Sequence, residues 1–384
     1  MPELAHRPRL LCVTHCIPAP TGSGLAMRGW ATLWALTETW AVTLLVVDHH
    51  TTAVRSLASD MVRRCERVVV LPKAATPEEV CTAVAGEAFA VVHVFRAAAR
   101  GIVDTIAPAL TGSPQRWIDL DDIESASYAR MAAIADGEAR AHRLRRFQNQ
   151  ERQALRIERD LVEQFDRVFV CSALDTGKLP PGRARIDVLP NVIFPPGKVA
   201  PARNSDPFTL LLLASWSYFP NDDGLQWLLE EIWPRARAMS PRPLRLLLAG
   251  RGRPTVPNLE RIADDPDVEL LGYVQDIDGL YARADLAVVP IRAGGGTRIK
   301  AIEAFAHRRP VVGSGIGLEG LDLVHGVHTL IADDPWAFAE AIVAVASDPI
   351  LRERLAASGH RHWQQRFTID AIVPILAPGS VASG

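Results

Sequence analysis

The residues best suited to chemistry lie in a glycine-rich turn in the C-terminal half of the chain. Gly294, Gly295 and Gly296 follow the apolar run Leu286–Pro290, and Thr297 and a helical pattern come next. Glycines allow positive φ angles and a close approach of a ligand to the backbone. A helix N-terminus adds unpaired N–H groups and the positive end of the helix dipole. This pattern predicts a site for a phosphate or diphosphate.

Charged residues follow the turn at helical spacing. Arg298 and Lys300 place two cations near the predicted anion site, and Glu303 comes one helical turn later. A carboxylate at that position is a suitable acceptor for a pair of hydroxyls, such as those of a ribose. A glycine-rich turn beside a solvated Lys–Glu pair is a common alternative. The combination of strand, glycines, cations and carboxylate favours nucleotide binding.

Polar residues also follow strand-like runs in the N-terminal half. His15, His93 and Asp119–Asp122 come at the ends of such runs. Because parallel sheets bind ligands beyond the carboxyl ends of their strands, we expect these residues at one edge of a sheet. The alternative for His93 is a structural histidine at a strand end. For Asp122 it is a helix N-cap with Ser125 beside it.

A second small-residue loop lies near the N-terminus. Gly22, Ser23 and Gly24 precede a predicted helix but lack the full GxGxxG pattern of dinucleotide binders. We interpret this loop as room for a sugar or phosphate. Arg28, one turn into the helix, is either an anion ligand or a solvated surface arginine.

These residues require a scaffold in which strands alternate with helices. The pattern predicts a helix at Leu25–Thr39 and an α/β protein with doubly wound parallel sheets. Predicted strands are Arg9–Thr14, Val42–Val47, Arg67–Leu71, Ala90–Val94, Arg116–Leu120, Arg167–Cys171, Phe208–Ala214, Arg245–Gly250, Val268–Leu271, Leu286–Pro290, Pro310–Gly313 and Val327–Ala332. From about Ala126 to Phe165 the chain is helical and rich in arginine, as in a solvated helix.

The length of 384 residues predicts two domains. A proline-rich, aperiodic stretch at residues 194–207 is the predicted linker. It separates a Rossmann-like domain at residues 1–193 from a second one at residues 208–360. Residues 361–384 are predicted to form a C-terminal helix that crosses back to the first domain.

The segment GGGTRIKAIEAFAHRRPVVGSGIGLEGL, from Gly294 to Leu321, resembles the donor site of GT-B glycosyltransferases of the retaining family 4. In that family the glycine turn holds the diphosphate of a nucleotide sugar. The second Glu of a Glu-x7-Glu motif binds the ribose, and the first contacts the transferred sugar. Glu303 matches the second, whereas Gly295 stands at the first, so that Glu is missing. The resemblance is to a bacterial branch.

The resemblance implies two Rossmann-like domains that face a central cleft, with an N-terminal acceptor domain and a C-terminal donor domain. It implies that His93 touches the transferred sugar and that Asp119 and Asp122 face the cleft. Tyr218, Pro220 and Asn221 stand where many members carry an Arg and a Lys, so diphosphate charge should fall on Arg298, Lys300 and the glycine amides. Gly272–Asp276 would contact the base, and Glu319 could reach the sugar.

The implied activity is that of a hexosyltransferase-like enzyme (EC 2.4) that works with retention and without metal. Asp119-Leu-Asp121 and Asp276-Ile-Asp278 match the Asp-x-Asp pattern that holds Mn²⁺ in other glycosyltransferases. We interpret neither as a metal site, and the second as a helix cap. Two alternatives stay open. One is an inverting GT-B transferase with a His15/Asp119 dyad, and the other is a GT-B protein that binds a nucleotide without turnover.

Composition narrows the expected partners. A net charge of −2 argues against non-specific binding to nucleic acid. The five scattered cysteines fit a reducing compartment, and no apolar run reaches the length of a membrane span. We therefore expect a cytoplasmic bacterial enzyme of polysaccharide or glycoconjugate biosynthesis, with at most peripheral membrane contact. Its partners would be a nucleotide-sugar donor and a small-molecule, glycan or lipid-linked acceptor, with no cofactor.

Overall fold

The computed structural model describes residues 7–48, 58–135, 140–201, 205–216, 218–257 and 264–380. Parts of the predicted linker (202–204), of the arginine-rich helix (136–139) and of the C-terminal segment (381–384) lie outside the described residues. The chain divides into two compact units. Unit 1 comprises Met1–Ile123, Arg152–Val192 and Ile369–Gly384, and unit 2 comprises Glu124–Glu151 and Ile193–Thr368.

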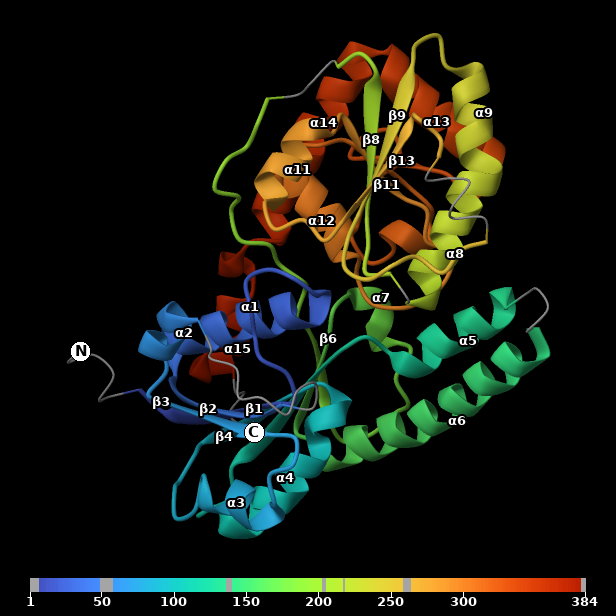
Figure 1. Ribbon diagram of the computed structural model, residues 1–384. Coiled ribbons are helices and arrows are strands. Elements are labelled where there is room, and N and C mark those ends of the chain that lie inside the picture. The colour runs from blue at the N-terminus through green and yellow to red at the C-terminus, as the bar shows by residue number, and fades with distance from the viewer. Residues whose placement is uncertain are drawn as a thin grey trace. The chain divides into compact units, whose positions relative to one another are not determined.

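Unit 1 is built on a seven-stranded parallel sheet with the order β3-β2-β1-β4-β5-β6-β7 (Figure 1). The strands are β1 (Arg9–Thr14), β2 (Ala41–Asp48), β3 (Arg67–Pro72), β4 (Val91–Phe95), β5 (Gln115–Asp121), β6 (Arg167–Val170) and β7 (Arg185–Val188). Its helices include α1 (Gly24–Thr39), α2 (Ser59–Arg64), α3 (Pro77–Thr82), α4 (Arg100–Ile106), α7 (Ala173–Thr176) and α15 (Val373–Leu376). All five residues of β4 are buried, as expected for a central strand with helices on both faces.

Unit 2 repeats this order in a six-stranded parallel sheet, β10-β9-β8-β11-β12-β13. The strands are β8 (Phe208–Leu213), β9 (Leu244–Ala249), β10 (Val268–Gly272), β11 (Leu286–Val289), β12 (Val311–Gly313) and β13 (Leu330–Ile331). The helices include α5 (Glu124–Ile134), α8 (Phe219–Trp227), α9 (Trp233–Met239), α11 (Ile277–Arg283), α12 (Ile299–Ala306), α13 (Pro335–Ser347) and α14 (Pro349–Arg366). In both sheets the order reverses beside the first strand, so a crevice for ligands is expected at β1/β4 and at β8/β11.

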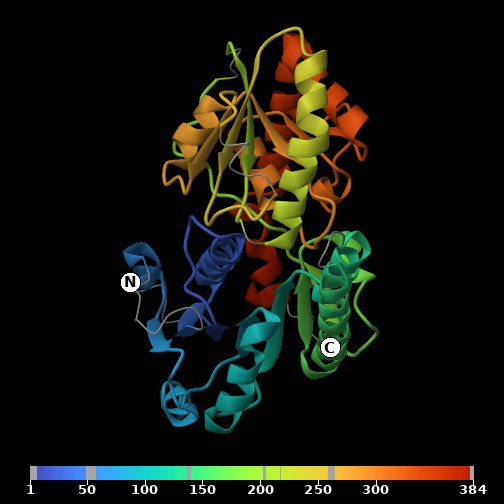
Figure 2. The ribbon, with the colours of Figure 1, turned by 45° about the vertical axis from the view of Figure 1, so that its right-hand side comes forward.

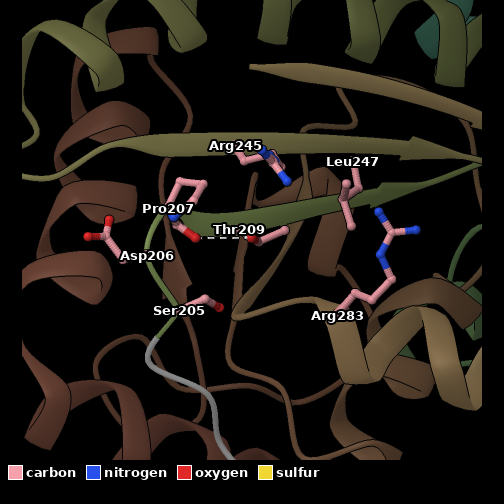
Figure 3. Close-up of a pocket in the computed structure, with 7 residues that line it drawn as sticks. All are labelled: Ser205, Asp206, Pro207, Thr209, Arg245, Leu247 and Arg283. Atoms are coloured by element: carbon pink, nitrogen blue, oxygen red, sulfur yellow. Dashed lines mark hydrogen bonds between the residues drawn. The ribbon is translucent and has the colours of Figure 1, made fainter. Parts of the chain in front are cut away.

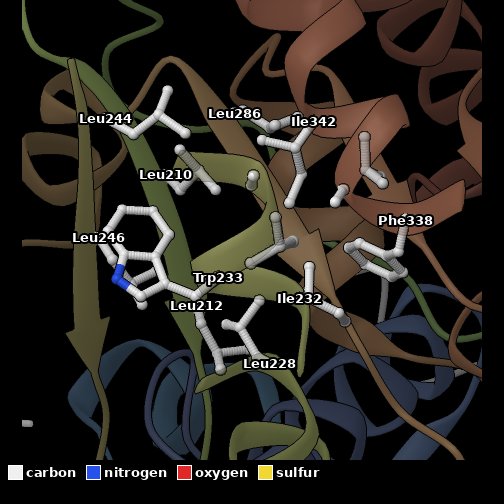
Figure 4. Packing of buried hydrophobic residues seen from close by; sticks show 14 of the residues in the cluster. Leu210, Leu212, Leu228, Ile232, Trp233, Leu244, Leu246, Leu286, Phe338 and Ile342 are labelled. Carbon is white, nitrogen blue, oxygen red and sulfur yellow. The ribbon is translucent and has the colours of Figure 1, made fainter. Parts of the chain in front are cut away.

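A single apolar cluster fills one face of the second sheet (Figure 4). Leu210 and Leu212 project from β8 at the two-residue spacing of a strand and meet Phe338 and Ile342 of α13 and Trp233 of α9. All five side chains are buried. The carboxyl end of β8 is thereby fixed beside β11, where the glycine turn begins.

Three features differ from the sequence expectations. Strand β7 was not predicted, because it is a short edge strand in which Arg185 and Asp187 alternate with apolar residues. The C-terminal helix predicted at residues 361–384 is broken, since α14 ends at Arg366 and α15 begins at Val373. Residues Glu124–Glu151 were assigned to the first domain, whereas their contacts group them with unit 2.

The last described residues pack on unit 1. The indole of Trp40 donates to the Leu376 carbonyl at 2.6 Å, and Arg167 donates to the Ile375 carbonyl at 3.2 Å. Within the described ranges, no helix is long and apolar enough to cross a membrane.

Candidate functional site

The glycine turn links the end of β11 to the start of α12 and requires glycine at two positions. Gly294 and Gly296 have φ angles of 96° and 68°, in the region that side chains rarely adopt. A Cβ on Gly294 would lie 3.2 to 3.3 Å from Arg298, Pro220 and Tyr218. The turn is therefore packed closely as well as sharply bent.

The N–H groups of the turn are available to a ligand. Among the described residues, the backbone N–H groups of Gly294, Gly295 and Gly296 donate to no protein acceptor. Helix α12 begins at Ile299, and the N–H groups of Ile299 and Lys300 likewise donate to no acceptor in the described chain, whereas that of Ala301 donates to the Arg298 carbonyl at 2.9 Å. Thr297 is buried between the two sets. This is the geometry of an anion site made of backbone amides.

Arg298 lies differently from the sequence expectation. It is the N-cap residue of α12, and its guanidinium donates to the carbonyl of Ala293 at 3.2 Å and to the carbonyl of Gly295. The sequence expectation is that these N–H groups bind phosphate oxygens. In this structure they hold carbonyls of the turn, and the binding of a diphosphate by Arg298 stays a prediction.

The side chain of Lys300 extends from α12 toward Asn221 of α8, near β8 and β11, where a crevice for ligands is expected. Its Nζ donates to Oδ1 of Asn221 at 2.9 Å, and Asn221 donates to the Ser215 carbonyl at 2.7 Å. Burial, reinforced by the nearby charge of Arg298, lowers the pKa of Lys300 to about 7. An anion bound beside it would restore the charge of the amine.

Glu303 is 8% exposed and belongs to a chain of polar contacts. The hydroxyl of Tyr281 donates to Oε2 of Glu303 at 3.3 Å. The Tyr281 ring stacks on His307 at 4.3 Å, and Nε2 of His307 is 2.9 Å from Oδ1 of Asp278. Burial raises the pKa of Glu303 to about 7, and Asp278 adds to the shift while Tyr281 opposes it. A carboxylate held in this way can accept hydrogen bonds from two hydroxyls.

Glu319 is not free to reach a sugar, because Arg130 binds it. Both terminal nitrogens of Arg130 donate to the two carboxylate oxygens at 2.7 Å, and Nη1 also donates to the Gly294 carbonyl at 3.1 Å. Sequence reasoning missed Arg130. It lies 189 positions before Glu319, within a helix that carries no motif.

His93 does not lie where the sequence interpretation placed it. It is the third of five residues in β4 and has no exposed surface, and its ring lies 6.0 Å from that of Phe169. Burial, together with the charges of Arg28 and Arg167, lowers the pKa of His93 to about 3, so the ring is neutral. The strand continues to Phe95, and this extension keeps His93 inside the sheet instead of at its edge.

Arg28 and Asp119 form a buried ion pair in unit 1. Arg28 is 3% exposed and donates to both oxygens of Asp119, to Oδ1 of Asn191 and to the Leu189 carbonyl. Burial opposes its charge, but the carboxylates of Asp119 and Asp121 raise the pKa of Arg28. Arg28 is therefore not a solvated surface arginine, and its guanidinium is bound to the sheet-end carboxylate of Asp119.

The remaining candidates of unit 1 lie at the carboxyl edge of the sheet. His15 follows β1 and is buried, but no hydrogen bond of Asp119 goes to it within the described chain. Asp122 directly follows β5 and is half-buried. In the Gly22–Gly24 loop, Gly22 has a φ of 112°, and the Ser23 hydroxyl caps α1 by accepting from Ala26 at 3.2 Å.

The Asp-x-Asp triplets have structural partners. Asp121 binds Arg96 at 2.9 Å. Asp276 caps α11 by accepting from the Gly279 N–H at 2.8 Å, as the sequence predicted. In the described parts of the chain, no three His, Cys, Asp or Glu side chains are grouped to hold a metal ion.

A cavity of about 300 Å³ lies at the other end of the second sheet, near the beginnings of β8 and β9 (Figure 3). Its lining is Ser205, Asp206, Pro207, Thr209, Arg245, Leu247 and Arg283. Ser205 and the Thr209 N–H bind Asp285, and Arg283 pairs with Glu269. The cavity is not part of the glycine-turn site.

Comparison with known proteins places the glycine turn in a recognised domain. Residues 207–348 match the family described as glycosyl transferases group 1. A curated relative, an uncharacterized 44.6 kDa protein in the cps region of Klebsiella pneumoniae, is 25% identical over 133 residues. The alignment covers 33% of this chain and 34% of that relative, so the chain spans about a third of the relative's length.

Solved structures match both sheets. HepE from Anabaena, in complex with UDP-glucose, matches 98% of this chain and 100% of its own with a TM-score of 0.70 at 14% identity. Sucrose-phosphate synthase from Thermosynechococcus elongatus matches 96% of this chain and 97% of its own, with a TM-score of 0.69 at 19% identity. WaaG, a glycosyltransferase involved in lipopolysaccharide biosynthesis, matches 97% of this chain and 100% of its own at 14% identity, with a TM-score of 0.63.

The chain therefore has the GT-B fold, with two Rossmann-like units of parallel strands and helices, as the sequence predicted. The matched domain and the fold together support a GT-B glycosyltransferase.

Proposed function

We propose that this protein transfers a sugar from a nucleoside-diphosphate sugar to a hydroxyl acceptor, with retention at the anomeric carbon and without a metal ion. The observation that carries this proposal is one arrangement in unit 2. Three unpaired N–H groups at Gly294–Gly296 lie beside Lys300, and the buried Glu303 follows one helical turn later. The similar HepE structures hold UDP, UDP with glucose, or UDP-glucose, which agrees with a donor of this class.

Each part of the donor has a matching group. The diphosphate would accept hydrogen bonds from the turn and from the first turn of α12, with Lys300 as its counter-charge. The ribose hydroxyls would donate to Glu303, whose carboxylate Tyr281 holds in place. The base would lie near Gly272–Asp276, which begins at the end of β10 and includes the exposed Tyr273.

The transfer step requires no protein nucleophile. The bond between the anomeric carbon and the diphosphate oxygen breaks, and the acceptor oxygen forms its bond on the same face of the sugar. The acceptor proton passes to the leaving phosphate oxygen. Negative charge grows on the diphosphate as the bond breaks, so the amide N–H groups and Lys300 stabilise the transition state more than the ground state.

The acceptor side rests on unit 1. His15 follows the carboxyl end of β1, and Asp121 and Asp122 lie at that of β5, the edge at which such sheets bind ligands. A glycan or lipid-linked acceptor fits the comparisons, since one relative is described from a cps region and WaaG acts in lipopolysaccharide biosynthesis. We propose a cytoplasmic role in polysaccharide or glycoconjugate assembly.

The test is a panel of nucleotide sugars screened by thermal shift, followed by assays of hydrolysis and transfer. A donor should raise Tm by mass action, and NMR of the product should show a retained anomeric configuration. Inversion would favour the alternative with His15 as base. Binding without any hydrolysis or transfer would favour a non-catalytic nucleotide-binding protein, and the absence of binding by every nucleotide sugar would contradict the proposal.

A further inference from the structure

Helix α5 and the start of α6 (Arg140–Gln164) pack directly on the glycine turn. Met131, Ala135 and Phe147 form a buried cluster with Ala293, the residue that precedes Gly294, and Phe219 packs against it. The Phe147 and Phe219 rings lie 5.1 Å apart. These two helices lie side by side in both views of the chain (Figures 1 and 2). They precede residues 207–348, so the turn is supported from outside the matched domain.

Arg130 is the polar contact of α5 with the turn. It binds the Glu319 carboxylate with two parallel hydrogen bonds and uses the same Nη1 for the Gly294 carbonyl. A two-pronged Arg–carboxylate pair fixes the guanidinium in direction as well as distance. Glu319 therefore orients the Arg130 guanidinium toward the turn, and its negative charge balances the positive charge of Arg130.

Two arginines together hold three successive carbonyls. Arg298 binds those of Ala293 and Gly295, and Arg130 binds the one of Gly294 between them. In a trans peptide the carbonyl and the next N–H point in opposite directions. Fixing these three carbonyls therefore points the N–H groups of Gly294, Gly295 and Gly296 away from the guanidinium groups.

We propose that Arg130 is a positioning residue that holds the glycine turn in its anion-binding form, with Glu319 as the residue that orients it. This inference rests on the proposed function, because it assigns the turn to a diphosphate. Arg130 acts through the Gly294 carbonyl and not by touching the ligand. A turn with two positive-φ glycines is otherwise free to adopt other conformations, which lowers its affinity by the fraction of time spent in them.

The experiment measures the affinity of inorganic pyrophosphate and of UDP for the full-length protein by calorimetry. Arg130→Met should weaken pyrophosphate binding by about tenfold, the effect of losing one charge-assisted hydrogen bond. Arg130→Lys keeps the positive charge but cannot donate two parallel hydrogen bonds to Glu319. Its affinity for pyrophosphate should therefore lie between those of Arg130→Met and the wild type. Arg145→Met is the matched control, because Arg145 is exposed and its side chain binds, among the described residues, only the Ala141 carbonyl of its own helix. Its affinity should equal that of the wild type.

Glu319→Gln separates positioning from simple electrostatics. Removing a negative charge near the turn should tighten anion binding if charge alone matters. If Glu319 orients Arg130, pyrophosphate binding should weaken by about threefold, because residue 319 then accepts only one of the two hydrogen bonds that the Arg130 guanidinium donates. Tighter binding by Glu319→Gln, or wild-type affinity in Arg130→Lys, would overturn the inference.

The outcomes also distinguish this inference from the proposed function. If the wild type binds neither pyrophosphate nor any nucleoside diphosphate, the proposed function fails. If the wild type binds and Arg130→Met binds equally well while its Tm falls, Arg130 is only structural. Should Arg130→Met not fold, Arg130→Lys and Glu319→Gln still decide the matter, because both preserve the size of the side chain.

Discussion

Glu303 is a buried carboxylate that accepts a hydrogen bond. Its carboxylate receives the Tyr281 hydroxyl, and its backbone carbonyl lies 2.7 Å from Nδ1 of His307. Removing the carboxylate leaves Tyr281 without that partner but creates no unpaired charge. Effects on ligand binding and on folding can therefore be separated at this position.

We predict that Glu303→Ala weakens donor binding by about 1.5–3 kcal/mol, the contribution of hydrogen bonds to a charged group. The folded structure should be retained, as measured by circular dichroism and Tm. Calorimetry with the nucleoside diphosphate that best stabilises the wild type gives the affinity. Pyrophosphate, which has no ribose, should bind the variant as well as the wild type, and an equal loss for both ligands would contradict the ribose assignment.

Lys300 gives the site a pH signature. Its pKa of about 7 means that at pH 8 the amine is mostly neutral in the free protein. A bound diphosphate favours the charged form and raises the pKa, so binding at pH 8 should take up close to one proton. Below about pH 6 the amine is already charged, and this uptake should vanish.

The measurement for this pH prediction is calorimetry at pH 8 in buffers of different ionisation enthalpy. Lys300→Met serves as the control and should bind more weakly with no proton uptake. Uptake of the same size in wild type and variant would show that another group titrates.

At the residue scale, sequence reasoning found the groups that lie close together in sequence. Gly294–Gly296, Lys300 and Glu303 fall within ten positions, and helical spacing already places them at one helix start. For His93 the sequence predicted a place at the sheet edge, whereas the structure buries it as the third residue of β4. Arg130 could not be found, since only tertiary packing brings α5 to the turn.

Helix α12, which carries Lys300 and Glu303, is fixed from behind by α14. A Cβ added to Gly359 of α14 would lie 2.4 Å from the ring of Phe305, a fully buried residue of α12. The absence of a side chain at Gly359 therefore lets the two helices approach closely. The helix that carries the candidate ligand residues thus depends on a glycine in another helix.

We predict that Gly359→Ala destabilises the protein by about 1–3 kcal/mol, the usual cost of overpacking a core. Helix propensity alone predicts the opposite sign, because alanine exceeds glycine by about 1 kcal/mol. Gly101 of α4 is the matched control, since nothing lies within 4 Å of its added Cβ. Gly101→Ala should be neutral or stabilising in urea denaturation, and a stabilising Gly359→Ala would show that α12 and α14 adjust freely.

At the element scale, buried parallel strands were predicted well because they are continuous apolar runs. The predicted β1 has the observed bounds, β8 differs by one residue at its end, and β9 is shifted by one residue at both ends. Strand β7 was missed since an edge strand needs no such run. The break between α14 and α15 had no clear sequence signal beyond Pro374, which falls in the first turn of α15.

At the scale of the whole molecule, the two units repeat one strand order but differ in charge at the carboxyl ends of their strands. In unit 1, Asp119 and Asp121 lie two positions apart on β5 and are neutralised by Arg28 and Arg96. In unit 2 the corresponding region presents amide N–H groups and Lys300, with no carboxylate in the turn itself. The two crevices therefore suit different ligands, and the second is the one that suits an anion.

For the proposed transferase, this difference predicts which groups would balance the charge of the donor diphosphate. A metal-dependent transferase needs free carboxylates beside the diphosphate, but Asp278 binds His307 and Asp276 caps α11. The carboxylates of Asp119 and Asp121 lie in unit 1, where they are bound to Arg28 and Arg96. In the proposed reaction, charge on the leaving diphosphate would therefore fall to backbone amides and Lys300, which need no ion.

We predict that sugar transfer continues at an unchanged rate in excess EDTA and gains nothing from added Mn²⁺ or Mg²⁺. Lys300→Met should lower kcat in both conditions, whereas Asp278→Asn should leave the response to EDTA unchanged. Activity that EDTA abolishes and Mn²⁺ restores would mean that a carboxylate leaves its partner to bind a metal ion.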